Sequence, residues 1–85
     1  MSKKDQFDKN IKLQHKLGDY IAKNPVLLKK YGESSYVMFV EGDKKLNKIN
    51  LELVESLKNR DKNKSVIMAT LTKNKTNPWK FQFAS

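Results

Sequence analysis

Eighty-five residues are enough for one small domain, in which the fraction of buried surface is only slightly above the marginal level. The chain has no cysteine, which excludes disulfides, thiolate metal sites and a cysteine nucleophile. Its formal net charge is +9, and the basic residues are 17 lysines and one arginine. Base recognition favours the arginine guanidinium, so this composition predicts at most non-specific binding of nucleic acid.

The ends and the apolar runs predict where the protein is found. Residues 1–6 are not followed by the apolar region of a signal peptide, and the longest apolar runs are far shorter than a membrane span. We therefore expect a soluble, cytoplasmic protein with no membrane contact. We also expect a single domain over residues 1–85, in which residues 1–6 are the part most prone to fray.

The first helical pattern covers residues 7–23, where apolar side chains recur at helical spacing. These side chains are Phe7, Ile11, Leu13, Leu17, Tyr20 and Ile21. Asn24–Pro25 ends the helix, because the residue before a proline avoids the α-helical conformation, and residues 26–31 then predict a short second helix. Gly18 falls on the apolar side of the first helix, where a glycine predicts the close approach of another backbone.

A strand–helix–strand pattern follows. Residues 35–41 and 65–72 are rich in β-branched and aromatic side chains and predict two buried strands. The apolar side chains between them predict an amphipathic helix, with Asp43 as its N-cap. A crossover of this length favours parallel strands and a right-handed connection.

The C-terminal segment predicts a third strand. Residues 73–78 read as a loop, and residues 79–83 alternate apolar and polar side chains in period two. After a loop this short we expect the strand 79–83 to lie antiparallel to 65–72. The fold class is therefore α/β, with the order helix, helix, strand, helix, strand, strand.

One short motif occurs twice. Asn10-Ile11-Lys12-Leu13 resembles Asn50-Leu51-Glu52-Leu53, and each copy precedes an apolar run that opens on a serine. This predicts an internal helix–strand pseudo-repeat. Asn10 and Asn50 both fall inside an apolar arc, and a buried amide needs a specific partner. We expect a structural role, in which each amide bonds a strand end or loop or the two amides bond each other; a polar pair lining a ligand pocket is the alternative.

No set of residues predicts catalysis, so we expect no enzyme, no cofactor and no metal site. His15 is the one histidine and lies at the polar flank of its helix. Glu41 and Asp43 flank a single glycine after a predicted strand, where their charges would repel a phosphate. A small-molecule site at that turn is the weakest functional alternative.

The aromatic C-terminal segment has two interpretations. The rings of Trp79, Phe81 and Phe83 are expected either to be buried in the sheet or to form a subunit contact, because a small domain gains from covering them. The alternative is a stacking platform for single-stranded RNA or DNA. The candidate contact residues in either case are Lys73, Lys75, Trp79, Lys80, Phe81 and Phe83. Three strands leave two sheet edges, which predicts a homodimer through an edge strand or through the aromatic face.

The chain resembles a family of short prokaryotic proteins classified as a domain of unknown function. The resemblance lies in four segments within about residues 7–72, namely Asn10 to Pro25, Val37 to Asp43, Asn50-Leu51-Glu52-Leu53 and Val66 to Leu71. It implies a fold but no activity. The expected function is a non-enzymatic binding or regulatory module that contacts a protein partner, and the alternative is an RNA- or DNA-associated protein.

Overall fold

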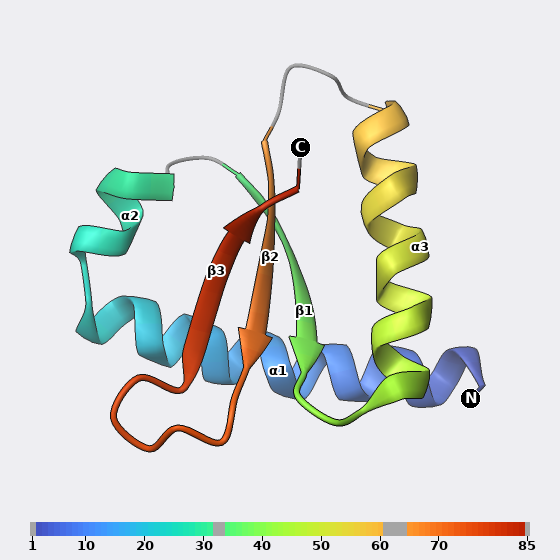
Figure 1. The fold of residues 1–85 in the computed structure, drawn as a ribbon, viewed down its shortest axis with the longest axis horizontal. Coiled ribbons are helices and arrows are strands. Elements are labelled where there is room, and N and C mark those ends of the chain that lie inside the picture. Colours follow the sequence, from blue (N-terminus) through green and yellow to red (C-terminus); the bar gives the residue numbers. More distant parts are fainter. Residues whose placement is uncertain (1, 32–33, 61–64, 85) are drawn as a thin grey trace. The chain divides into compact units, whose positions relative to one another are not determined.

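The computed structural model describes residues 2–31, 34–60 and 65–84 (Figure 1). It divides into two compact units, residues 1–33 and residues 34–85, and each unit is described by itself. The order α1, α2, β1, α3, β2, β3 confirms the predicted α/β fold class. The expectation of a single domain stays a prediction.

The first unit consists of two helices, α1 (Lys3–Lys23) and α2 (Val26–Tyr31). Helix α1 begins after Ser2, whose hydroxyl accepts a hydrogen bond from the Asp5 N–H at 3.1 Å. This N-cap explains why residues 3–6, which we expected to be the most prone to fray, are helical. The helix ends at Asn24, whose side-chain amide donates to the Tyr20 carbonyl at 2.8 Å.

The faces of α1 differ from the predicted arc at three positions, one of which is Ile11, at 37% exposure. Leu13 and Leu17 are buried, as expected, but Phe7 is 64% exposed. Gly18 is also exposed, and a Cβ built on it meets no atom of the described residues within 4 Å. No backbone of the first unit therefore approaches Gly18 closely, and a close approach by another part of the chain stays a prediction.

The second unit is built on a mixed sheet of three strands, β1 (Ser35–Val40), β2 (Val66–Leu71) and β3 (Trp79–Phe83), in that spatial order. Strands β1 and β2 are parallel, and β2 and β3 are antiparallel, which confirms both predicted pairings. The first two strands are slightly shorter than the ranges 35–41 and 65–72.

Helix α3 (Lys44–Arg60) connects β1 to β2 and lies beside β1 (Figure 1). Its predicted N-cap is confirmed, because the Asp43 carboxylate accepts a hydrogen bond from the Leu46 N–H at 3.1 Å. The turn before it depends on Gly42, whose φ of 90° lies in the left-handed region that glycine adopts readily. The Asp43 N–H closes the turn by donating to the Val40 carbonyl at 3.0 Å.

The core of the second unit lies between α3 and one face of the sheet. Its buried cluster consists of Val37, Phe39, Val54 and Val66, and the half-covered side chains packed against it are Leu57, Met68 and Ala84. The alternate strand residues point to the opposite face, where Ile67 and Ala69 are fully buried. The pseudo-repeat stays a prediction, because α1 and β1 belong to different units.

Candidate interaction surfaces

Asn50 is a buried structural residue, as the sequence predicts. Its side chain is 0% exposed, and its Nδ2 donates a hydrogen bond to the Met38 carbonyl at 2.7 Å. Met38 belongs to β1, so the amide joins the middle of α3 to a strand. This donor satisfies the Met38 carbonyl, which the apolar side chains of the core could not do because they carry no hydrogen-bond donor.

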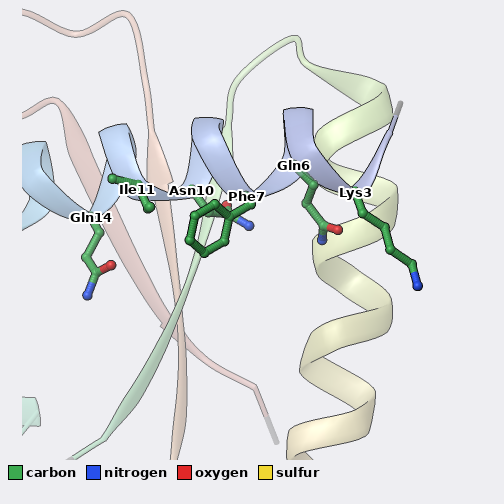
Figure 2. Close-up of a pocket in the computed structure, with 6 residues that line it drawn as sticks. All are labelled: Lys3, Gln6, Phe7, Asn10, Ile11 and Gln14. Carbon is green, nitrogen blue, oxygen red and sulfur yellow. The ribbon is translucent and has the colours of Figure 1, made fainter.

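Asn10 lies in a different environment. It is half-buried on α1, between Phe7 and Ile11, and its side chain projects from the same side of the helix as theirs (Figure 2). It is in the first unit and Asn50 is in the second, so a contact between the two amides stays a prediction.

Asn47 is a structural residue that sequence reasoning missed. Its Oδ1 accepts a hydrogen bond from the Val40 N–H at 2.9 Å, and its Nδ2 donates to the Val40 carbonyl at 2.8 Å. One side chain therefore pairs with both main-chain groups of a residue in β1. Its spacing of three from Asn50 puts both amides on the same side of α3, and this spacing was the available signal.

The aromatic C-terminal residues do not form a single platform with the lysines. Trp79 is buried, at 5% exposure, while Phe81 is half-buried and Phe83 is 50% exposed. Period-two alternation along β3 puts Lys80 on the opposite face from the three rings. The structure thus favours burial over base stacking for Trp79.

The other two candidate lysines lie in the loop that joins β2 to β3. Lys73 and Lys75 are exposed, and the loop between them is organised by Asn74. The Asn74 Oδ1 accepts hydrogen bonds from the N–H groups of Thr76 at 2.9 Å and Asn77 at 3.0 Å. An asparagine that folds its own loop in this way leaves the neighbouring lysine side chains directed to solvent.

The polar turn after β1 has a structural use for both of its carboxylates. The Glu41 Oε2 accepts a hydrogen bond from the Lys73 N–H at 3.4 Å, and Asp43 caps α3. His15 is exposed, as predicted. Within residues 2–31, 34–60 and 65–84, no group of three or more histidine and acidic side chains could hold a metal ion.

An open hollow lies along one side of α1. It is lined by Lys3, Gln6, Phe7, Asn10, Ile11 and Gln14, which we call the α1 surface. Figure 2 shows all six side chains projecting from the same side of the helix. Phe7 and Ile11 give this surface an exposed apolar centre, at 64% and 37% exposure, and the other four side chains around them are polar.

The comparisons with known proteins give no relative. No family model, curated protein or solved structure matches this chain. The resemblance to a family of unknown function therefore stays a prediction. None of the described helices is both long enough and apolar enough to cross a membrane.

Proposed function

We propose that this chain is a non-enzymatic binding module that acts in the cytoplasm through protein–protein contacts. The observation that supports this function is the exposed apolar centre of the α1 surface. A large aromatic side chain at 64% exposure next to a second apolar side chain is typical of a contact that a partner covers.

The proposed partner is a second copy of the chain, bound through α1. Phe7 and Ile11 are four residues apart, the spacing with which one helix packs against another. Amides that are both donors and acceptors, such as that of Gln14, can pair with their own copy across a two-fold axis. The predicted contacts through an edge strand or through the aromatic face stay alternatives, although Trp79 is buried and Asn47 bonds the β1 edge.

Sedimentation at micromolar concentration tests this proposal. We expect the wild-type chain to sediment as a dimer and Phe7→Ser to sediment as a monomer with unchanged helical circular dichroism. Val26→Ser is the matched control, because Val26 is 72% exposed on α2 and lies outside the α1 surface. A wild-type monomer at all concentrations, or a Phe7→Ser dimer as stable as the wild type, would overturn the homodimer.

The alternative function, association with RNA or DNA, is supported by the exposed lysines of the C-terminal segment and by the net charge of +9. Counterion release makes such binding weaken steeply as salt rises. Fluorescence anisotropy with a labelled single strand at about 150 mM salt separates the two functions. Sub-micromolar affinity there would favour the nucleic-acid function, and a pull-down with and without nuclease would show whether a protein partner persists.

A further inference from the structure

Strand β1 lies at an edge of the sheet, and its main chain has two sides. The N–H groups of Ser35 and Glu41 donate to the Ser65 and Leu71 carbonyls, each at 2.9 Å, so the odd-numbered residues of β1 face β2. Because these groups alternate along a strand, Met38 and Val40 direct theirs away from β2. This outer side is the one on which another strand could pair.

The amides of α3 occupy that outer side. Asn47 bonds both main-chain groups of Val40, and Asn50 bonds the Met38 carbonyl. The donor and acceptor that Asn47 offers are those that a neighbouring strand would offer. We propose that Asn47 and Asn50 close the β1 edge against an added strand, in particular against β1 of a second copy.

Helix α3 and strand β1 match in residue spacing as well as in hydrogen-bonding groups. Residues three apart on a helix are separated by about 4.5 Å along its axis, and residues two apart on a strand by about 6.6 Å. Asparagine side chains can bridge that small difference, so two amides from adjacent helical turns reach two successive outward-facing residues. The sheet edge is thus closed by side chains of the same chain, without a charge or a proline on the strand itself.

Asn47→Leu tests the proposal. Leucine has the same branched arrangement of heavy atoms as asparagine, in a larger side chain, but neither donor nor acceptor, so the Val40 N–H loses its partner. We expect hydrogen exchange at the Val40 amide to become about tenfold faster or more. We also expect assemblies larger than those of the wild type, with increased thioflavin binding.

Two variants separate edge opening from other effects. Asn59→Leu is the matched control, because Asn59 is exposed on the same helix, and it should assemble as the wild type does. Asn47→Asp keeps an acceptor for the Val40 N–H but puts a charge at the edge, so it should lose stability without assembling further.

These results can be told apart from those for the proposed α1 dimer, because each variant is compared with the wild-type chain. The Asn47 variants test whether assembly increases beyond the wild-type state, whichever state that is. If Asn47→Leu does not fold, Asn47→Ala removes the same two bonds and must show the same shift in assembly. The proposal is overturned if Asn47→Leu, or Asn47→Ala in its place, assembles no further than the wild type. It is also overturned if Asn47→Asp or Asn59→Leu assembles as readily as Asn47→Leu.

Discussion

Among the described residues, four asparagine side chains hold main-chain groups that no helix or strand partner reaches, and the first is Asn24, which bonds the Tyr20 carbonyl at the end of α1. Asn47 and Asn50 bond β1 from α3, and Asn74 bonds its own loop. A short amide carries both a donor and acceptors, which lets it replace a backbone partner at close range. Asparagine in this chain therefore contributes to the fold at particular positions, beyond its general abundance.

The burial of Asn50 predicts a large effect of its removal. We expect Asn50→Ala to lower the free energy of unfolding by about 1–3 kcal/mol, because the Met38 carbonyl would stay buried without its donor. Asn10→Ala should cost less, since Asn10 is half-buried. Urea denaturation measures both, with Asn59→Ala as the exposed control on α3. Equal stability of Asn50→Ala and Asn59→Ala would contradict the prediction.

The two described glycines predict substitutions of opposite sign. A Cβ would meet no neighbour within 4 Å at Gly42 or Gly18. The effect of an alanine on stability therefore depends on the backbone conformation alone. Gly42 has a φ of 90°, and Gly42→Ala should destabilise the fold by about 1–2 kcal/mol. Gly18→Ala, in the middle of α1, should instead stabilise it by about 0.5–1 kcal/mol. Thermal melts of the two variants on either side of the wild type would confirm this contrast.

The aromatic side chains of strand β3 become more exposed from its start to its end. Trp79 at its start is buried, while Phe83 at its end is half-exposed, although both rings point to the same face. The strand therefore contributes to the core mainly at the end next to the loop. A strand that is covered at one end only can contribute to stability without being a uniform contact surface.

This gradient predicts unequal effects of two alanine substitutions. Trp79→Ala should destabilise by about 3–5 kcal/mol, as is usual for a buried tryptophan. Phe83→Ala should cost clearly less, because 50% of the side chain is exposed already. Denaturant titration gives both values. If Trp79→Ala were the milder change, or selectively abolished nucleic-acid binding while leaving stability intact, the burial of Trp79 would not explain its role.

At the scale of the whole molecule, the sequence predicted the element order and both strand pairings because periodicity reports which face of an element is covered. It could not place the start of α1, because Ser2 and the charged residues after it carry no apolar period. The sequence also predicted wrongly that Phe7 is buried. Helical spacing shows that Phe7 lies on the apolar side of α1, but it does not show how much of the length of that side is buried. Asn47 was missed because a polar helical residue is exposed by default.

The candidate C-terminal site was predictable only in part. The alternation of 79–83 correctly indicates a strand, but a list of nearby lysines and rings ignores which face each one takes. Lys80 is adjacent to Trp79 in sequence and on the other side of the sheet from it in space. The same period-two pattern that predicts a strand also predicts that neighbouring residues lie on opposite faces. It therefore argues against one binding site formed by Lys80 and the three rings.

The parallel pairing of β1 with β2 has a consequence for the order of folding. Strands β2 and β3 are joined by the short loop 72–78, whereas β1 can meet β2 only after the chain has closed around the whole of α3. Contacts of greater sequence separation carry a larger entropy cost and form later. We expect Phe81→Leu in the hairpin to slow folding and Val37→Ala in β1 mainly to speed unfolding, as stopped-flow kinetics would show. The strand held by the asparagine amides would then be the last to join the sheet.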